Sequence, residues 1–409
     1  MTTTCHLPLK GAEVALIEHP RNPTADAALA RILALGAGVT LVLPGAVARW
    51  QRRDLRVVVS RTDSEDALCA ALSTLPRRPD AVLSFSHHLC AMAGRVAERL
   101  RVCGFDPMSL QALSDKREVR QRTVDEPSAV DYWALSVNED LLARSAEFTY
   151  PLVVKPTGET SSTNVLRVRS PREFVDAAER VRQIRLTRKG TTLDGTVLVE
   201  ALCEGPEYSV ELTSGPRHTS CLGVTEKLPL GSHPFIEQAD TFPAVGREAG
   251  AIAMAAVSVL QTFPAYIGPA HVELRATPGG PKLIEVNGRQ PGGFVADLVR
   301  WTTGRDIFTE AICTLLGVES RREEPVAGGA TWWQVYAPQA GVVTACGIPR
   351  RALDGSVRFA SMRCRVGDVV KSATDNHGRV GDLVVVGDDP AESLSRAREI
   401  ASLIRLDIA

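Results

Sequence analysis

The stretch HVELRATPGGPKLIEVNGR, residues 271–289, organises the interpretation of the whole chain. Two runs with strand character, residues 270–277 and 281–288, flank the segment Pro278-Gly279-Gly280. A short connection that contains glycine is typical of a β-hairpin. The sequence therefore predicts two antiparallel strands, which we place with the turn centred on Gly279.

One face of this hairpin is predicted to be apolar. With the turn at Gly279, Val272 faces Val286 and Leu274 faces Ile284. Side chains alternate between the two faces of a strand, so these four residues share a face that is suited to burial.

The other face carries charged and amide side chains. Glu273 lies opposite Glu285, His271 lies opposite Asn287, and Arg289 is two residues further along. Facing carboxylates destabilise a sheet unless a positive charge lies between them. Carboxylate and amide oxygens are the ligands that Mg²⁺ and Mn²⁺ prefer, so Glu273, Glu285 and Asn287 are predicted metal ligands. The alternative is a solvent-facing hairpin whose charges lie in water.

Composition sets the general class of the protein. With 409 residues, of which 44% are hydrophobic, the chain can bury large cores, and its length suggests about three domains. The net charge of -1 gives no electrostatic reason to expect nucleic acid or an anionic membrane as a partner. No basic segment followed by an apolar core opens the chain, and no later run is long enough to span a bilayer. We expect a soluble, cytoplasmic protein.

Cysteine and lysine usage adds two points. The nine cysteines are scattered without a C-x-x-C pair, which is typical of reduced core residues rather than of a zinc site or a disulfide framework. Only seven of the 47 basic residues are lysine. Arginine is therefore the usual cation of this chain, and each lysine is a candidate for a special role.

The N-terminal part alternates between short apolar strands and helical stretches, which predicts a parallel sheet with helices on its faces. No G-x-G-x-x-G follows the first strand, so a dinucleotide site is not expected there. His87 lies where a strand runs into a helix, a position that often faces a ligand crevice. A capping or surface histidine is the alternative. The segment Gly104–Ser109 interrupts the pattern and is predicted to be a linker. The strands are expected at residues 13–17, 39–43, 56–60 and 81–85, and the helices at 24–35, 64–75 and 88–101.

A basic helix is predicted after this linker. Ser114-Asp115 can cap it, and it carries Lys116, the first of the internal lysines. Its arginines, at positions 117, 120 and 122, are interpreted as ordinary surface charge.

A second lysine ends a buried strand at residues 150–156, YPLVVKP. An ammonium group there is costly unless it finds an anion, so Lys155 is a candidate phosphate ligand. The loop Gly158–Asn164 follows, and its backbone N–H groups and hydroxyls, those of Ser161 and Ser162 among them, can bind phosphate oxygens. The alternative is a solvated turn with a lysine that reaches water.

Four features follow one another along the chain: Asp115-Lys116, the strand ending at Lys155, the strand ending at Glu200 followed by Gly205-Pro-Glu207, and Glu273 with Glu285-Val-Asn287-Gly-Arg289. In this order they resemble the ATP-grasp superfamily. The likeness extends over nearly the whole chain and implies an ATP-grasp fold, α/β and α+β in class, with an N-terminal Rossmann-like domain and a C-terminal β-rich lobe. The expected domains are residues 1–112, 113–325 (with subdomains at about 113–198 and 199–325) and 326–409.

The resemblance also implies roles for individual residues in binding ATP with two divalent cations, Mg²⁺ or Mn²⁺. Lys116, Lys155, Ser161 and Ser162 would hold the phosphates, Glu200 and the backbone at Leu202 would contact adenine, and Glu207 would bind the ribose. Glu273, Glu285 and Asn287 would hold the cations. Arg289 would bind the acceptor carboxylate or the acyl phosphate, and Lys227 would help to stabilise the oxyanion of the second step.

Within the superfamily the chain is most similar to the carboxylate-amine ligases, including the branch that joins two amino acids. The likeness rests on Thr225-Glu-Lys227, on residues 237–243 and 287–293, and on a β-rich region, residues 330–387, with a closing helix. Trp332 and Trp333 in that region are predicted core residues.

Three departures from the family pattern concern the phosphate loop and the substrate site. The loop has a single glycine where family members usually have several. Glu237-Gln-Ala-Asp240 stands where dipeptide-forming members often show Glu-x-x-His, and His87-His88 stands where they carry an acidic residue. The substrate-site residues are expected to be Glu237, Asp240, His87, Gly292 and Gly293.

The hypothesis is an ATP-dependent ligase that activates a small carboxylic acid as an acyl phosphate and joins it to an amine. One alternative is an ATP-grasp enzyme that uses formate or bicarbonate, as purine-pathway members do. Another is a nucleotide-binding regulatory protein without turnover. A homodimer is a further option, because dimers are common among similar proteins.

Overall fold

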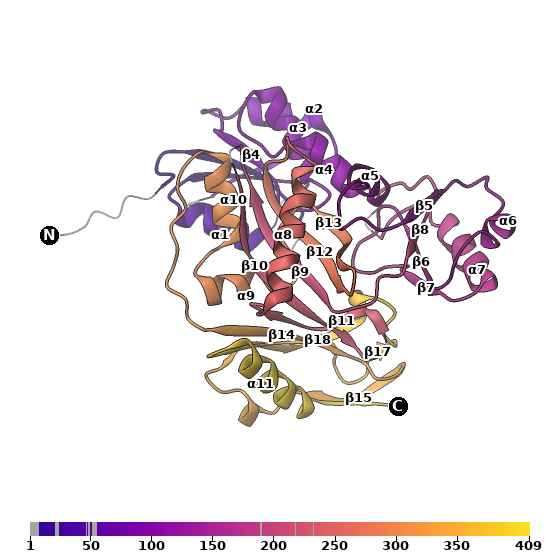
Figure 1. Ribbon diagram of the computed structural model, residues 1–409. Helices are drawn as coiled ribbons and strands as arrows, with labels where there is room; N and C mark the ends of the chain where they lie inside the picture. Colours follow the sequence, from indigo (N-terminus) through magenta and orange to yellow (C-terminus); the bar gives the residue numbers. More distant parts are fainter. Residues whose placement is uncertain are drawn as a thin grey trace.

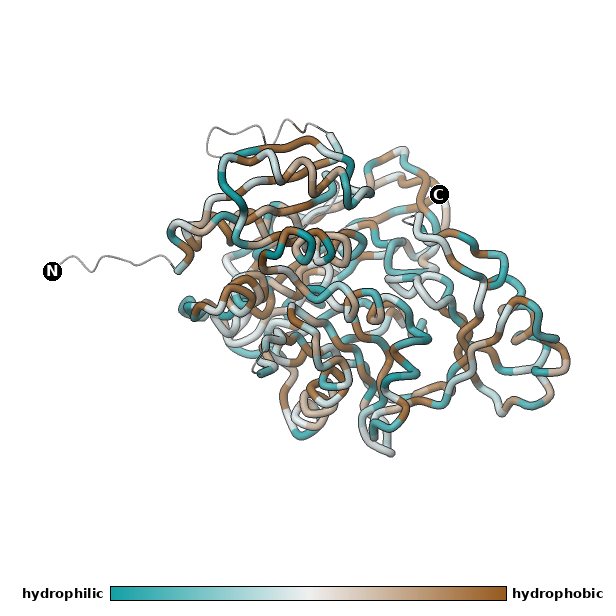
Figure 2. Tube along the Cα trace, turned by 90° about the horizontal axis from the view of Figure 1, so that it is seen from above, coloured by the Kyte–Doolittle hydropathy of each residue, from teal (hydrophilic) through white to brown (hydrophobic). Residues whose placement is uncertain are grey.

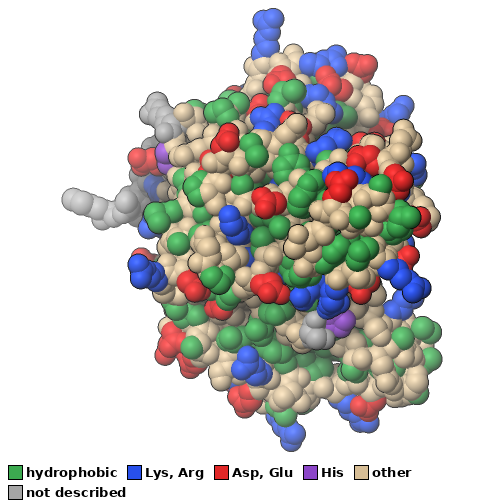
Figure 3. All heavy atoms as spheres, turned by 45° about the vertical axis from the view of Figure 1, so that its right-hand side comes forward, with side chains coloured by type: hydrophobic (Ala, Val, Ile, Leu, Met, Phe, Trp, Pro, Cys, Tyr) green, Lys and Arg blue, Asp and Glu red, His purple; other side chains and the backbone are tan. Residues whose placement is uncertain are grey.

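The computed structural model describes residues 8–20, 24–45, 47, 50, 55–188, 190–216, 218–231 and 233–409. Cys5 lies outside this range, and the eight cysteines inside it are all free thiols. None of the described helices is both long enough and apolar enough to cross a bilayer. On the face drawn in Figure 3, acidic and basic side chains are interspersed rather than gathered by sign.

The N-terminal part is a four-stranded sheet in the order β3-β2-β1-β4. All its strand pairs are parallel, and helices cover it, as the alternating pattern predicted (Figure 1). Its strands are β1 (Glu13–Ile17), β2 (Gly38–Leu43), β3 (Arg56–Val59) and β4 (Ala81–Leu83), and its helices are α1 (Ala25–Ala34), α2 (Glu65–Ser73) and α3 (Cys90–Leu100).

The predicted linker at Gly104–Ser109 is wrong in its second half. Helix α4 (Pro107–Ser114) begins there because the side chain of Asp106 accepts a hydrogen bond from the Ser109 N–H and caps it. Helix α5 (Lys116–Arg122) follows and is capped by Asp115, as expected.

A four-stranded antiparallel unit comes next, in the order β5-β8-β6-β7, with its own hydrophobic core. It projects from one side of the molecule (Figure 1). The sequence pattern predicts a helix from Pro171 to about Arg188, but helix α7 ends six residues earlier, at Arg182. The unit contains β5 (Tyr132–Leu135), β6 (Leu152–Pro156), β7 (Leu166–Val168), β8 (Val197–Ala201), α6 (Leu141–Ser145) and α7 (Pro171–Arg182).

The largest element is an eight-stranded antiparallel sheet in the order β13-β12-β9-β10-β11-β14-β18-β16. It continues across residues 325–326, where a domain boundary was expected, because β11 pairs with β14. Several of its strands are buried along most of their length, β9 and β18 among them. Hydrophobic and hydrophilic stretches are interspersed along the whole chain (Figure 2). The strands are β9 (Glu207–Ser214), β10 (Thr219–Leu230), β11 (His233–Phe242), β12 (Gly268–Thr277), β13 (Gly280–Asn287), β14 (Gly329–Tyr336), β16 (Val357–Met362) and β18 (Arg379–Gly387).

Helices and a small sheet complete the C-terminal half. The strand β19 (Arg405–Ile408) comes after the closing helix α11 (Pro390–Ser402), where sequence patterns predicted none, and it pairs with β15 (Gly341–Gly347). The remaining elements are β17 (Val369–Val370), α8 (Arg247–Gln261), α9 (Val295–Thr303) and α10 (Ile307–Leu315).

The hairpin β12–β13 has the predicted register at its open end. His271 pairs with Asn287, Val272 with Val286, and Glu273 with Glu285. A β-bulge then shifts the register by one residue, so the predicted pairing of Leu274 with Ile284 is wrong.

The bulge follows from the length of the turn. Strand β12 ends at Thr277 and β13 begins at Gly280, so the loop has two residues and is not centred on Gly279. Leu274 pairs with Leu283, and both lie in the core. Ile284 is the extra residue. Its side chain lines a pocket instead of the core.

Candidate functional site

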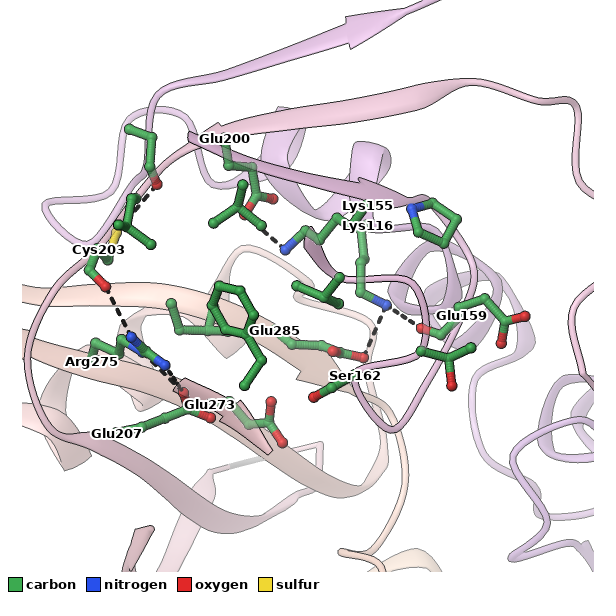
Figure 4. A pocket seen from close by; sticks show the side chains of 18 residues that line it. Lys116, Lys155, Glu159, Ser162, Glu200, Cys203, Glu207, Glu273, Arg275 and Glu285 are labelled. Carbon is green, nitrogen blue, oxygen red and sulfur yellow. Dashed lines mark hydrogen bonds and ion pairs between the residues drawn. The ribbon is translucent and has the colours of Figure 1, made fainter. Parts of the chain in front are cut away.

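Two adjoining pockets make up the site. The first lies between the β5-β8-β6-β7 unit and the large sheet (Figure 4). The second lies between the N-terminal sheet, the β12–β13 hairpin and the C-terminal strands. Ser162, Glu273 and Glu285 line both pockets. We call them the nucleotide pocket and the substrate pocket.

A buried charge cluster forms one wall of the nucleotide pocket. The Glu200 carboxylate, on β8, accepts from Arg120 Nε at 2.8 Å and lies 2.7 Å from Lys155 Nζ, on β6. All three side chains are almost fully buried. Burial alone raises the pKa of Glu200, but the two cations, Arg120 first, outweigh it and hold that pKa at about 2. Burial lowers the pKa of Lys155.

Arg120 was wrongly interpreted as surface charge. Its side chain is 3% exposed, and its guanidinium also donates to the backbone carbonyl of Ile284. It therefore connects α5, β8 and β13 at the nucleotide pocket.

This cluster predicts a pH dependence of stability. The pKa of Glu200 is about 2 in the folded protein, against 4.5 for the ordinary group. A carboxyl whose folded pKa is depressed stabilises the fold above its ordinary pKa and loses that contribution as pH falls through its folded pKa. The contribution at neutral pH is about 3 kcal/mol. We expect the difference in unfolding free energy between the parent and Glu200→Gln, measured by urea denaturation, to be constant above about pH 5 and to shrink between about pH 4.5 and 2. A difference that stays constant down to the acid limit would contradict it.

The second predicted phosphate lysine reaches the same pocket from another element. Lys116 Nζ, at the start of α5, lies 3.2 Å from Glu285 and donates to the backbone carbonyl of Glu159. Figure 4 shows Lys116 and Lys155 directed into one space above the hairpin. The predicted lysines and acids therefore meet, although more than 100 residues separate them in the chain.

The loop between β6 and β7 takes an unusual backbone for its composition. Ser161, Ser162 and Asn164 have φ angles of 60°, 57° and 59°, in the left-handed region that favours glycine. The backbone carbonyl of Ser161 accepts a hydrogen bond from the Asn376 N–H at 3.3 Å. The C-terminal lobe thus contacts the predicted phosphate loop directly.

The far end of the nucleotide pocket holds Glu207 and Leu202. Glu207 accepts two hydrogen bonds from Arg275, at 2.8 and 2.9 Å, and Arg275 also donates to the Cys203 carbonyl. Sequence reasoning missed Arg275. The signal was its position, two residues after Glu273 on the same strand face.

Glu273 is held by two cations. Its Oε1 accepts a hydrogen bond from Lys227 at 2.8 Å and lies 2.9 Å from Nε2 of His271. The other ring nitrogen of His271, Nδ1, faces the buried Glu211. Burial alone lowers the pKa of His271, but Glu211 first and then Glu273 raise it to about 9. Lys227 and His271 therefore supply the positive charge that offsets the repulsion between the facing carboxylates of Glu273 and Glu285. Neither His271 nor Glu211 was predicted to have a role in the site.

Lys227 lines the substrate pocket and reaches the shared wall at Glu273. Its ammonium also donates to Glu237 at 2.7 Å. Burial alone lowers the pKa of Lys227, but the surrounding carboxylates, Glu237 and Glu273 first, raise it well above its ordinary value. The lysine is therefore charged at neutral pH.

The residues predicted for the substrate site all line the substrate pocket: His87, Glu237, Asp240, Gly292 and Gly293, together with Asn287 and Arg289. Gly293 has φ of 59°, and a Cβ there would meet the Trp332 ring at 1.9 Å, so only glycine fits. Trp332 is 4% exposed and belongs to the core, as predicted, but its ring also lines this pocket.

The donor set on the hairpin fits Mg²⁺. Glu273 and Glu285 face each other and Asn287 lies beside them, so hard oxygens gather on one strand face. The described part of the chain contains no group of three or more His, Cys, Asp or Glu arranged for a metal ion. Mg²⁺ is usually held by one or two carboxylates while phosphates and waters complete its shell, so two acids beside a nucleotide pocket suit it.

Two family profiles match the chain. An ATP-grasp domain spans residues 148–297, and an L-amino acid ligase C-terminal domain 2 spans residues 333–409. The chain is an ATP-dependent ligase with an ATP-grasp domain. The first range holds both acids of the hairpin, and the second holds Asn376, His377 and Arg379, which line the substrate pocket.

Several proteins are similar to this ligase. The uncharacterized protein y4rH of Sinorhizobium fredii is 27% identical over 340 residues, which cover 81% of the ligase and 70% of y4rH. Carnosine synthase 1 of Gallus gallus is 24% identical over 356 residues, 81% of the ligase but 37% of the synthase. The crystal structure of the L-amino acid ligase from Bacillus licheniformis superposes with a TM-score of 0.78 over 98% of the ligase and 99% of that chain, at 19% identity.

Proposed function

We propose that this ligase uses ATP to convert a small carboxylic acid, such as an amino acid, into an acyl phosphate and then joins it to an amine, releasing ADP and phosphate. The observation that carries the proposal is the shared wall of the two pockets, made of Ser162, Glu273 and Glu285. Among the described lining residues, these three alone border both pockets. A phosphoryl group would therefore pass from the nucleotide to the acid at this wall.

For the first step, Lys116 and Lys155 bind the phosphates with the hydroxyls and N–H groups of Ser161 and Ser162. Glu200 and the backbone at Leu202 contact adenine, and Glu207 binds the ribose. Glu273, Glu285 and Asn287 would hold two Mg²⁺ ions, which supply neutralisation of the charge that spreads over the moving phosphoryl group. Fixed lysine ammonium groups stabilise the same charge without reorganising during the reaction.

For the second step, Arg289 and Lys227 bind the negative oxygens. The Arg289 guanidinium donates to the Gln290 carbonyl and to the Asn287 amide oxygen, which leaves further N–H groups for a carboxylate or acyl phosphate. Lys227 donates to Glu237 and Glu273, so its third N–H remains for the oxyanion of the amine adduct. Glu237, Asp240 and His87 contact the substrates.

The comparisons support an amino acid as the acid. The C-terminal profile is that of L-amino acid ligases, and three residues inside its range, Asn376, His377 and Arg379, line the substrate pocket. The same fold in a solved L-amino acid ligase agrees with this choice.

The test is phosphate release with MgATP and pairwise mixtures of the twenty proteinogenic L-amino acids, with products identified by mass. We expect ADP, phosphate and an amide to form together for a subset of pairs. Incorporation of labelled formate or bicarbonate, with no amide from any pair, would instead support the one-carbon alternative. ATP binding without ADP in every mixture would support a regulatory protein.

A further inference from the structure

Asp240 presents one bound and one unbound oxygen at the substrate pocket. It lies on β11 directly opposite Lys227 and is 1% exposed. Its Oδ2 accepts a hydrogen bond from Gln334 Nε2 at 3.0 Å. Its Oδ1 is buried and has no hydrogen-bond partner among the residues that the structure describes. A buried carboxyl oxygen without a partner costs free energy, which a ligand with a suitable donor recovers.

Gln334 fixes which oxygen is left over. This side chain is fully buried on β14 and lines neither pocket. Its Oε1 accepts from the Tyr336 hydroxyl and from Arg379 Nη1, both at 3.0 Å. Because two donors point at Oε1, the amide has one orientation, with its NH₂ group toward Asp240. A flipped amide would place its NH₂ group against the Tyr336 hydroxyl and the Arg379 guanidinium, which are themselves donors. Gln334 therefore holds Asp240 in one rotamer.

We propose that Gln334 is a positioning residue that reserves Asp240 Oδ1 for an N–H group of the amine substrate, and so makes the pocket select amines over equally shaped alcohols. The inference rests on the proposed function, since it assigns the amine to this part of the substrate pocket. The surroundings agree with a cationic or strongly donating group. Glu237 and Glu273 lie nearby, and Lys227 is already committed to both of them.

The selectivity is expected to come from charge. A hydroxyl can also donate to Asp240 Oδ1, but it lacks the positive charge of an ammonium group, and charge-assisted bonds are about twice as strong as neutral ones. An ammonium group also favours the ionised form of Asp240, whose pKa is raised well above its ordinary value by burial first and by Glu237 second.

The experiment measures binding by calorimetry, with L-alanine methyl ester as an amine that has no free carboxylate and methyl L-lactate as its hydroxyl counterpart. Both are titrated into the full chain with Mg²⁺ and a non-hydrolysable ATP analogue. We expect the parent to bind the amine about tenfold more tightly than the alcohol. Gln334→Met keeps the side-chain length and removes the donor, so we expect the preference to fall to about twofold or less.

Tyr336→Phe is the matched control. It removes another bond to the same Gln334 but leaves the Asp240 contact and the Arg379 contact in place, so the tenfold preference should remain. Unchanged affinity for the ATP analogue shows that each variant is folded at the nucleotide pocket. Should Gln334→Met fail to fold, Asp240→Asn provides the same test, because it keeps the shape and removes the carboxyl oxygen.

Each outcome decides the inference. A parent that binds the two esters equally, or that binds neither, overturns it, and so does a Gln334→Met protein that keeps the full preference. Loss of the preference in Gln334→Met but not in Tyr336→Phe supports it. Because binding is measured without turnover, a failure of the proposed reaction would show separately, as no phosphate release from any amino-acid pair. In a turning-over enzyme the KM for the amine should rise while the KM for ATP stays constant.

Discussion

Glu285→Gln is expected to lower kcat for ADP release by about 100- to 1,000-fold, the range seen when one group that stabilises transition-state charge is removed. Glutamine keeps the size of the side chain and removes its charge. The carboxylate lies on the shared wall of both pockets and 3.2 Å from Lys116. Without it, a cation bound beside the phosphates loses a ligand. The measurement is steady-state ADP release with the best amino-acid pair at saturating ATP and several Mg²⁺ concentrations.

Glu226→Gln is the control for this experiment. Glu226 is a neighbour of Lys227 on β10, but its side chain is exposed and lines neither pocket. We expect its kcat to stay within about twofold of the parent, since surface substitutions rarely matter. Equal rates for the parent and Glu285→Gln would remove Glu285 from the reaction. If Glu285→Gln binds ATP within a few-fold of the parent but loses kcat, then Glu285 acts on phosphoryl transfer rather than on nucleotide affinity.

Arg120→Met is expected to lower the free energy of unfolding by about 3 kcal/mol. Removing one partner of a buried ion pair leaves the other charge without full compensation, which is far more costly than the pair is stabilising. Glu200 would keep only Lys155, and the Ile284 carbonyl would lose its donor. Urea denaturation at neutral pH gives the value.

Arg122→Met is the matched control on the same helix. Arg122 is exposed and pairs with Glu118 four residues earlier, so its loss should cost less than about 0.5 kcal/mol. Adding Glu200→Gln to Arg120→Met should lower the stability further, because the buried Lys155 then loses the carboxylate that it pairs with. Similar costs for the two arginine variants, or a double variant as stable as Arg120→Met, would contradict the buried-cluster interpretation.

The sequence was sufficient for the open end of the hairpin and insufficient beyond it. Strict alternation from His271 to Glu273 and from Glu285 to Asn287 determined which side chains share a face. The pairing of Leu274 depended instead on whether the loop has two or three residues, and Pro278-Gly279-Gly280 permits either. A one-residue difference moved Ile284 from the predicted core to the nucleotide pocket.

Long-range contacts were the main part that could not be predicted. Arg120 lies among four other charged residues of α5, and only its packing against Glu200, 80 residues later, shows that it is buried. Asn376 and Arg379 reach the substrate pocket, and Gln334 reaches Asp240, only because β11 pairs with β14. No local pattern in residues 326–409 indicates that pairing. The lysines and acids were predictable, since Lys155, Glu200, Glu273 and Glu285 lie on strands with a clear pattern and Lys116 follows the cap of a helix.

The pairing of β11 with β14 also limits how this chain can be divided or recombined. Cutting at residue 325 would leave the ladder of β11 open along residues 239–242 and would separate Asp240 from Gln334. Exposed strand edges recruit other chains, so such a fragment would tend to self-associate. A C-terminal module exchanged between relatives would need the β11 strand that matches its own β14. Because Asp240 lies on β11 and Gln334 on β14, the proposed amine preference and the C-terminal lobe would be inherited together.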